Sequence, residues 1–382
     1  MKILQVIPYF TTDKGGEVNV VTNISKELVT LGHDVTIITS DFEKAKNSVP
    51  ALPGVEVLFF KTTFNFSLFI YTPSMKKWLL DHLSDYDVVH LHGYRTYQNN
   101  IAVSISKKFN KSVILQPHGS FPIIVEKFLL KSIFDVFWGK EIIEQSKYII
   151  AVSETERQQL LSQGDIPSSK IITIPNGIDL KSYEQLPDRN EFRDELGISA
   201  DVKLILFVGR LHKRKGIDFL IDSFAKALTT RDDLILVVSG PDQGQGSNLQ
   251  KLVEKLNIKD KVIFSGYIND VRKAYVACDL LVYPSTYEIF GLVPFEGLMC
   301  GTPVIVTNDC GCGEIIGKAD CGILVKYGDT DALRGAIINL IEDRKIADKI
   351  VENGQNYVVN NLLWEKIILR FLGVYEDRVH NI

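Results

Sequence analysis

Short apolar segments recur along the whole chain and alternate with segments that have the periodicity of amphipathic helices. In the first half the predicted strands are Ile3–Ile7, Val35–Thr39, Val55–Phe60, Val88–Leu91, Val113–Gln116, Ile149–Val152 and Ile171–Ile174. In the second half they are Leu204–Val208, Leu234–Ser239, Val262–Phe264, Leu280–Tyr283, Val304–Val306 and Gly322–Val325. Strands that are apolar on both faces are typical of parallel sheets covered by helices. The alternation therefore predicts an α/β fold with doubly wound, Rossmann-like parallel sheets.

The alternation is interrupted by a polar, turn-rich stretch between Pro175 and Asn190. Since 382 residues suffice for two domains of ordinary size, we predict two doubly wound domains that meet at this stretch. A cleft between two such domains is the usual place for a ligand. The segment from Trp364 to Val379 is predicted to be a final helix.

Composition excludes several classes of protein. Hydrophobic residues make up 45% of the chain and charged residues 24%, which is typical of a folded globular protein. The net charge of −4, without a basic arm, argues against a nucleic-acid partner. No apolar run approaches the 18 residues of a membrane span. Five cysteines without CxxC spacing argue against a disulfide framework, and the chain opens on a strand-like segment instead of a signal peptide, so we expect a cytoplasmic protein.

The segment from Glu288 to Glu296 combines two carboxylates with the start of a helix. Pro294 lacks an amide hydrogen and belongs in the first turn of that helix. The free amides of Gly291 and Leu292 then point out of the helix end and can hold a phosphate, while the carboxylates suit vicinal hydroxyls. The segment predicts the donor site of a sugar-transferring enzyme, although the pair alone also fits two solvated glutamates on a helix.

Two glycine-containing loops follow predicted strands and support a phosphate site. Gly15 and Gly16 lie before a helix that opens near Val18, without the GxGxxG of a dinucleotide site. Arg210 and Lys215 lie in a loop bracketed by glycines, where they could neutralise a diphosphate. The alternatives are an ordinary βα turn and a solvated basic loop.

Histidines and paired acidic or sulfur side chains give weaker signals. His118 follows a strand and precedes a glycine, which indicates a residue of the cleft. His90 and His92 share one face of a strand, where hydrogen-bonded core histidines are the favoured interpretation. Asp85-Tyr86-Asp87 precedes its strand, so we expect it to initiate the strand and not to bind metal. Cys310 and Cys312 are the only closely spaced cysteines, and we favour no metal there.

In their order and spacing, these motifs resemble those of the retaining, nucleotide-sugar-dependent glycosyltransferases of the GT-B fold that carry the E-x7-E signature (glycosyltransferase family 4, or glycosyl transferases group 1). Nearly the whole chain takes part in the resemblance. The matching segments are Gly15-Gly16, His118-Gly119, Val152-Ser153-Glu154, Pro175 to Asp179, Gly209-Arg210, Lys215-Gly216, Ser239-Gly240, Ser265-Gly266-Tyr267, Pro284-Ser285 and Glu288 to Glu296. The chain departs from the pattern at Cys310-Gly311-Cys312-Gly313, where relatives usually have a Gly-Gly pair ahead of the residue equivalent to Glu314.

The resemblance implies an acceptor-binding domain over residues 1–178 with the C-terminal helix 365–382, and a donor-binding domain over residues 179–364. It implies catalysis without a metal or other cofactor. The resemblance also implies a role for each site residue. Arg210 and Lys215 hold the diphosphate, Glu288 and His118 contact sugar hydroxyls, and Glu296 contacts the ribose. The amides of Phe290, Gly291 and Leu292 cap phosphate or sugar, Gly266, Tyr267 and Ile268 lie against the base, and Gly15 and Gly16 lie near phosphate and acceptor.

The partners expected are a UDP- or GDP-sugar donor and a glycan or lipid-linked acceptor. Two aromatic segments, from Phe64 to Tyr71 and from Phe121 to Phe137, are candidates for acceptor or peripheral membrane contact at the inner membrane face. The alternative for the second segment is an amphipathic helix that packs on its own domain. A nucleotide-sugar epimerase of the same fold and a non-catalytic nucleotide-sugar-binding protein are the other functions considered.

Overall fold

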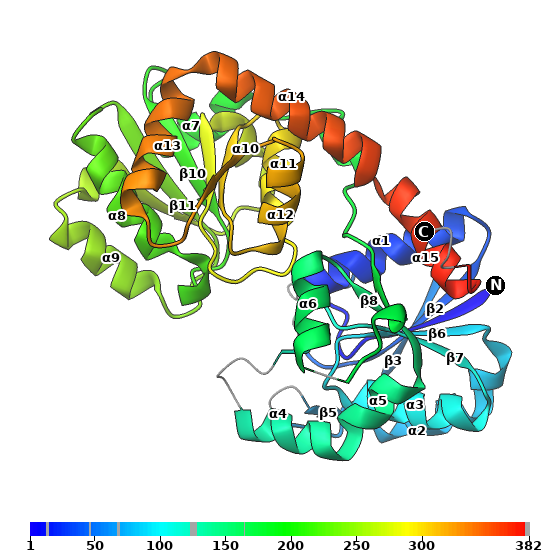
Figure 1. Cartoon of the computed structure of the whole chain (residues 1–382). Helices are drawn as coiled ribbons and strands as arrows, with labels where there is room; N and C mark the ends of the chain where they lie inside the picture. Colours follow the sequence, from blue (N-terminus) through cyan, green and yellow to red (C-terminus); the bar gives the residue numbers. More distant parts are fainter. Residues whose placement is uncertain (13–14, 46, 67–68, 123–127, 164, 379–382) are drawn as a thin grey trace. The chain divides into compact units, whose positions relative to one another are not determined.

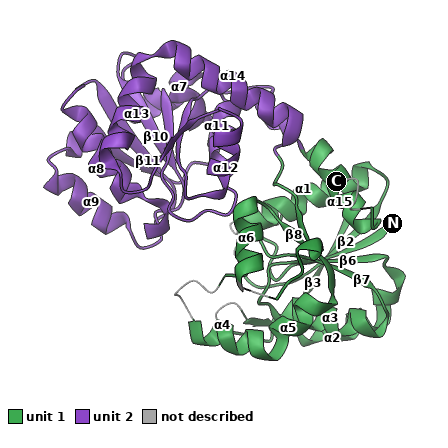
Figure 2. Cartoon of the chain, viewed as in Figure 1, with its two compact units in different colours: residues 1–177, 364–382 green, residues 178–363 purple. Residues whose placement is uncertain are grey.

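The computed structural model describes residues 1–12, 15–45, 47–66, 69–122, 128–163, 165–378. The chain divides into two compact units (Figure 2). Unit 1 consists of Met1–Gly177 and Trp364–Ile382, and unit 2 consists of Ile178–Leu363. Each division lies one residue before the position expected from the sequence.

Unit 1 is built on a parallel sheet of seven strands in the order β3-β2-β1-β6-β7-β8-β9. Its strands are β1 (Lys2–Val6), β2 (Asp34–Ser40), β3 (Val55–Phe60), β6 (Val88–His92), β7 (Ser112–Gln116), β8 (Ser146–Ala151) and β9 (Ile171–Thr173). A separate antiparallel pair, β4 (Phe64–Phe66) and β5 (Phe69–Tyr71), forms from the first aromatic segment. This pair was not predicted from the sequence.

Helices cover both faces of this sheet. They are α1 (Gly16–Thr30), α2 (Pro73–His82), α3 (Tyr97–Lys108), α4 (Phe128–Phe134), a π-helix η3 (Asp135–Gly139), α5 (Lys140–Gln145), α6 (Glu154–Gln163) and α15 (Trp364–Tyr375), with 3₁₀ turns η2 (Leu83–Asp85) and η4 (Ser168–Lys170). The strand order reverses direction after β3, between β1 and β6 in the sheet, so right-handed crossovers place α1 on one face and α3 on the other. The C-terminal α15 lies beside α1 (Figure 1), and side chains of both helices pack on β1, β6 and β7.

Unit 2 is built on a parallel sheet of six strands in the order β12-β11-β10-β13-β14-β15. Its strands are β10 (Lys203–Val208), β11 (Leu234–Ser239), β12 (Val262–Gly266), β13 (Leu280–Tyr283), β14 (Val304–Thr307) and β15 (Ile323–Val325). Its helices are α7 (Arg189–Leu196), α8 (Ile217–Leu228), α9 (Gly246–Lys255), α10 (Arg272–Ala277), α11 (Val293–Met299), α12 (Gly311–Lys318), α13 (Thr330–Glu342) and α14 (Arg344–Asn361), with 3₁₀ turns η5 (Leu180–Tyr183), η6 (Lys213–Lys215) and η7 (Lys259–Lys261).

The strand order of unit 2 also reverses, between β10 and β13. Because crossovers are right-handed, α8 and α9 lie on one face of the sheet and α11 and α12 on the other. Such a reversal leaves a crevice at the carboxyl ends of the two strands, where open α/β sheets bind ligands. The predicted α/β fold is confirmed, since every strand predicted from the sequence overlaps an observed strand.

The final helix ends at Tyr375, earlier than predicted. In the second aromatic segment the structure describes α4 from Phe128, and this helix continues into the π-helix η3, while residues 123–127 lie outside the described residues. No described helix is long and apolar enough to cross a membrane.

Candidate active site

Three glycines hold the carboxyl ends of β10, β11 and β12 close together. The Gly209 amide donates to the carbonyl of Ser239 at 2.9 Å, and the Gly240 amide donates to the carbonyl of Gly266 at 2.7 Å. A Cβ on Gly240 would lie 1.9 Å from the Gly209 carbonyl oxygen, so no other residue fits there. This packing joins the carboxyl ends of the three strands that lie on one side of the strand reversal.

Lys215 and Glu288 meet at this edge because their strands, β10 and β13, are neighbours in the sheet. The loop of Lys215 is fixed to the loop of Glu288 by the Thr286 amide, which donates to the Arg214 carbonyl at 2.9 Å. Gly216 has φ +64°, and a Cβ there would lie 2.0 Å from the Pro284 carbonyl oxygen. Glycine is therefore required for the close approach that forms the Lys215–Glu288 ion pair.

Tyr283, at the end of β13, completes this cluster. Its hydroxyl lies 2.9 Å from Nζ of Lys215 and donates to Oε2 of Glu288 at 2.7 Å. Burial raises the pKa of Tyr283 well above its ordinary value, so the phenol keeps its proton and acts as the donor. Oε1 of Glu288 has no hydrogen-bond partner among the described residues, and the Glu288 side chain is 24% exposed. The carboxylate is thus oriented by the protein on one oxygen and open on the other.

The helix start predicted from Pro294 is observed, with Leu292 as the N-cap of α11. Gly291 has φ +75°, and a Cβ there would lie 3.0 Å from Cγ of Glu288 and 3.1 Å from Sγ of Cys312. Gly291 therefore makes room for the protein's own side chains, a packing reason that the sequence did not reveal.

Glu296 lies one turn into α11 and is more deeply placed than Glu288. The Tyr275 hydroxyl donates to its Oε2 at 2.8 Å. Burial raises the pKa of Glu296, and the bond from Tyr275 opposes that rise. Each of the two glutamates is hydrogen-bonded by a tyrosine that the sequence did not single out.

The other predicted residues of unit 2 lie in loops at the same edge. The Arg210 side chain is exposed, and in the described part of the chain it makes no ion pair or side-chain hydrogen bond. Tyr267 is 72% exposed, and it follows Gly266, the last residue of β12. Ile268 is half-buried, and Phe290 is buried.

In unit 1, Gly15 and Gly16 lie at the amino end of α1, where a Cβ on either would meet no other atom within 4 Å. Asp13 and Lys14 of this loop lie outside the described residues. His118 follows β7, is half-buried and has φ +52°. The unit therefore gathers its predicted residues at the carboxyl edge of its own sheet.

His118 is hydrogen-bonded within the protein, a feature that its sequence position did not predict. Its Nε2 lies 2.9 Å from Nδ1 of His92, whose Nε2 lies 2.5 Å from Oε1 of Gln5. His90 and His92 are buried and hydrogen-bonded, as predicted. Beside His118, the buried Glu156 accepts from the amides of Gly119 and Val152 at 2.6 and 2.8 Å.

Two predictions about possible metal ligands can be compared with the structure. The Asp87 carboxylate accepts from the Lys2 amide at 2.8 Å, so it joins the starts of β6 and β1. The Sγ atoms of Cys310 and Cys312 lie 3.2 Å apart and both side chains are buried. Among the described residues no group of three or more potential ligands could hold a metal ion.

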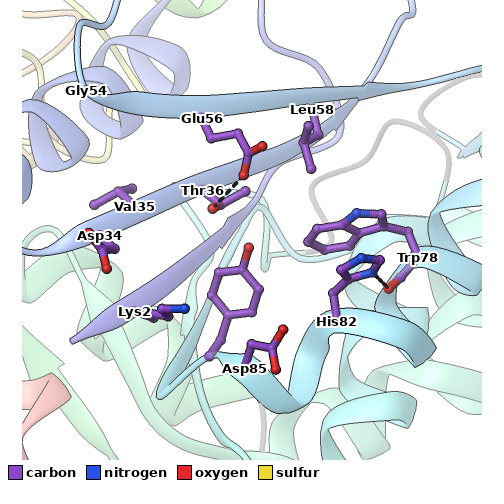
Figure 3. A pocket seen from close by; sticks show the side chains of 11 residues that line it. Lys2, Asp34, Val35, Thr36, Gly54, Glu56, Leu58, Trp78, His82 and Asp85 are labelled. Carbon is purple, nitrogen blue, oxygen red and sulfur yellow. Dashed lines mark hydrogen bonds between the residues drawn. The ribbon is translucent and has the colours of Figure 1, made fainter.

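A hollow of about 470 Å³ lies elsewhere in unit 1, at the amino ends of the strands (Figure 3). Trp78 and His82 stack on one wall, and Glu56 and Thr36 are hydrogen-bonded on another. Since ligands of parallel sheets bind at the carboxyl ends, this hollow is not the predicted site.

The chain is similar in sequence to known glycosyltransferases. Residues 14–182 match the family model "Glycosyltransferase Family 4", and residues 188–357 match "Glycosyl transferases group 1". An uncharacterized glycosyltransferase of Methanocaldococcus jannaschii is 27% identical over 92% of each chain. The N-acetyl-alpha-D-glucosaminyl L-malate synthase of Bacillus anthracis is 28% identical over 95% of this chain and 94% of its own.

Solved structures share the fold. Anabaena Alr3699/HepE in complex with UDP superposes with a TM-score of 0.81 at 19% identity, covering 99% of this chain and 100% of that one. Sucrose-phosphate synthase from Thermosynechococcus elongatus gives a TM-score of 0.79 at 22% identity over all of both chains.

The fold and the matches define a transferase of the GT-B type. The chain belongs to the glycosyltransferases of family 4, also described as glycosyl transferases group 1.

Proposed function

We propose that the chain is a retaining glycosyltransferase that moves a hexose-type sugar from a UDP- or GDP-sugar to a glycan or lipid-linked acceptor. The observation that carries the proposal is the cluster of Lys215, Tyr283 and Glu288 at the strand reversal of unit 2. It places a cation and an oriented carboxylate side by side, which are the groups that a diphosphate and a sugar diol require. The UDP in the Anabaena structure supports a nucleotide donor.

In the proposed reaction, the bond between the anomeric carbon and the phosphate oxygen breaks, and a bond from an acceptor hydroxyl to that carbon forms on the same face. The proton of the acceptor passes to the leaving phosphate. Negative charge grows on the diphosphate as its bond to the sugar breaks, and Lys215 and the exposed Arg210 neutralise it. We propose that these side chains perform the task of a metal, so that none is required.

Further roles follow for the other site residues. Oε1 of Glu288 accepts from sugar hydroxyls, and Glu296 accepts from the ribose. The amides of Phe290, Gly291 and Leu292 hold phosphate or sugar, and Gly266, Tyr267 and Ile268 lie against the base. Unit 1 binds the acceptor, Gly15 and Gly16 lie near phosphate and acceptor, and His118 contacts a sugar hydroxyl.

A thermal-shift screen with UDP-, GDP- and ADP-sugars in EDTA tests the donor and the metal independence together. A ligand at 100 times its dissociation constant should add about 2.7 kcal/mol of stability. We expect a shift with one nucleotide family, lost in Arg210→Ala and Glu296→Ala. Product analysis with an acceptor distinguishes transfer from epimerisation, which consumes donor without one. No shift with any nucleotide sugar would contradict the proposed donor class.

An exposed apolar surface supports a separate proposal about the membrane. Packing within unit 1 leaves Leu129, Val136 and Phe137 of α4 and η3 at least 70% exposed. Isolated exposed apolar residues are common, but several on one short helical segment mark an interaction site. We propose that this surface makes peripheral contact with a membrane or a lipid-linked acceptor. Flotation with liposomes tests it: Val136→Lys with Phe137→Lys should abolish co-flotation, and absence of wild-type binding at low salt would rule it out.

A further inference from the structure

Four polar side chains lie fully buried on one face of three adjacent strands of unit 1: Gln5, His90, His92 and Gln116. Gln5 is aligned with His90, and His92 with Gln116. Toward the amino ends of the strands, the same face carries apolar side chains that pack against α15. Buried polar groups are costly without partners. Gln5, His90 and His92 are hydrogen-bonded, while both amide atoms of Gln116 have no partner among the described residues.

The direction of the hydrogen bonds follows from the partners. Oε1 of Gln5 is a carbonyl oxygen and can only accept, so Nε2 of His92, at 2.5 Å, carries the proton. Burial lowers the pKa of His92 well below its ordinary value, so the ring is neutral and its Nδ1 holds a lone pair. Nε2 of His118, 2.9 Å from that Nδ1, must therefore be the donor.

The orientation of the Gln5 amide decides the direction of the whole chain of hydrogen bonds. On the other side of Gln5 lies Tyr375 of α15, whose hydroxyl is 2.8 Å from Nδ1 of His90. Burial raises the pKa of Tyr375, and the Gln5 side chain opposes that rise, although Nε2 of Gln5 has no hydrogen-bond partner among the described residues. The contact that fixes the orientation is the one at 2.5 Å, which places Oε1 of Gln5 against Nε2 of His92.

His118 is neutral as well, because burial lowers its pKa to about 3. A neutral ring protonated at Nε2 has a lone pair at Nδ1. Nδ1 of His118 has no hydrogen-bond partner in the described part of the chain, and it is not among the buried polar atoms that lack a partner. It is therefore an open acceptor at the carboxyl edge of the sheet.

We propose that Gln5 and His92 are positioning residues that hold His118 in the Nε2–H tautomer, so that His118 accepts a hydrogen bond from a substrate hydroxyl through Nδ1. The inference rests on the proposed function, in that a hydroxyl-bearing substrate binds at the carboxyl end of β7. It also restricts the role of His118: the side chain orients a hydroxyl and neither pairs with phosphate nor donates a proton to a leaving group. A histidine in the opposite tautomer would offer a donor and would lose this contact.

The tautomer can be measured directly in the full chain with ¹⁵N-labelled histidine. Long-range ¹H–¹⁵N spectra distinguish a protonated from an unprotonated ring nitrogen, and a His118→Asn spectrum assigns the His118 signals. We expect protonated Nε2 and unprotonated Nδ1 for His118 in the wild-type protein at neutral pH. A proton on Nδ1 of His118 would overturn the inference, and this readout needs no substrate to bind.

Two variants of Gln5 test whether this side chain determines the tautomer of His118. Gln5→Glu keeps an acceptor for His92 and should preserve the His118 tautomer, whereas Gln5→Leu removes the acceptor and should give a mixture of tautomers. An unchanged, single tautomer in Gln5→Leu would show that Gln5 does not set the direction.

The functional consequence is tested with UDP-glucose as the probe, by its affinity and by UDP release. We expect Gln5→Leu to bind UDP with unchanged affinity but to turn over UDP-glucose roughly tenfold more slowly, the size of one weakened transition-state contact. The double variant with His118→Ala should be no slower than His118→Ala alone. Additive losses, or wild-type turnover in Gln5→Leu, would contradict the inference. If the wild-type protein does not bind UDP-glucose, that donor is excluded, while the tautomer measurement still decides the inference.

Discussion

The hydroxyl of Tyr283 lies between Lys215 and Glu288, 2.9 Å from the Lys215 ammonium nitrogen and 2.7 Å from Oε2 of Glu288. The tyrosine ends a central strand of unit 2, so its ring is held by the sheet and not by a loop. A rigid hydroxyl that accepts from Lys215 and donates to Glu288 prearranges both charged side chains before any ligand arrives. Preorganised groups contribute most to catalysis because they need no rearrangement as charge develops.

The first prediction concerns Lys215. We expect Lys215→Gln to lower kcat/KM by about 100- to 1,000-fold, since it removes the half-buried cation from the growing charge of the diphosphate. Tyr283→Phe should lose roughly tenfold, because it removes one hydrogen bond and keeps both charges. Lys213→Gln is the matched control, because Lys213 is exposed in the same turn. Equal activity of Lys215→Gln and Lys213→Gln would refute the assigned role.

The second prediction separates backbone strain from site geometry. Gly291 and Gly301 both have a positive φ, +75° and +83°, but only at Gly291 would a Cβ meet other atoms within 4 Å, those of Glu288 among them. Either alanine variant should lose about 1–2 kcal/mol of stability from the left-handed backbone. Gly291→Ala should in addition weaken nucleotide-sugar binding, whereas Gly301→Ala should not. Chemical denaturation and calorimetric titration measure the two effects; unchanged affinity in Gly291→Ala would show that Glu288 tolerates displacement.

The strands and the loops that follow them could be predicted from sequence because their cause is local. Apolar runs flanked by glycine and polar residues identify a parallel strand and its carboxyl end, and so Gly209, Lys215, Glu288 and His118 were found without a structure. Pro294 likewise predicted the start of α11 through the missing amide hydrogen.

The partners of these residues could not be predicted, because they depend on strand register and on contacts across long stretches of chain. Gln5 and His92 are 87 residues apart, and Tyr283 and Lys215 are 68 apart. Each partner is a polar residue inside an apolar strand, which is the only sequence signal for them. The space that Gly291 leaves beside Cys312 of α12 likewise depends on a contact between distant parts of the chain.

The third prediction concerns the pH dependence of nucleotide binding. Glu296 must be ionised to accept hydrogen bonds from two hydroxyls. Because burial raises its pKa, the affinity should fall as the pH decreases through that raised pKa. Tyr275→Phe removes the hydrogen bond that lowers this pKa, so the loss of affinity should begin at a higher pH than in the wild-type protein.

Calorimetric titration of the nucleotide between pH 5 and 8 measures this difference. Glu296→Gln serves as the reference, because it should bind weakly with little dependence on pH. Coincident pH profiles for the wild-type protein and Tyr275→Phe would mean that Tyr275 does not control the ionisation of Glu296.

The last prediction concerns the buried Glu156, whose carboxylate binds the amides of Gly119 and Val152 beside His118. Burial raises its pKa from 4.5 to about 7, against the opposing effect of the two hydrogen bonds. Between these values the folded state holds more protons than the unfolded state, so stability decreases as the pH rises through this range. The decrease contributed by this group is at most about 3 kcal/mol, from 1.36 kcal/mol per unit of pKa shift.

Glu156→Gln removes the ionisable carboxyl and with it this pH dependence of stability. The variant can have a different stability at any single pH, so the comparison is made across a pH range. The difference in free energy of unfolding between the wild-type protein and Glu156→Gln should therefore be largest near pH 5 and become smaller toward pH 8. Glu154→Gln is the control, because Glu154 is exposed on the same helix. Urea unfolding at a series of pH values measures both variants. A constant difference for Glu156→Gln would show that this carboxyl ionises in the folded protein as it does in the unfolded chain.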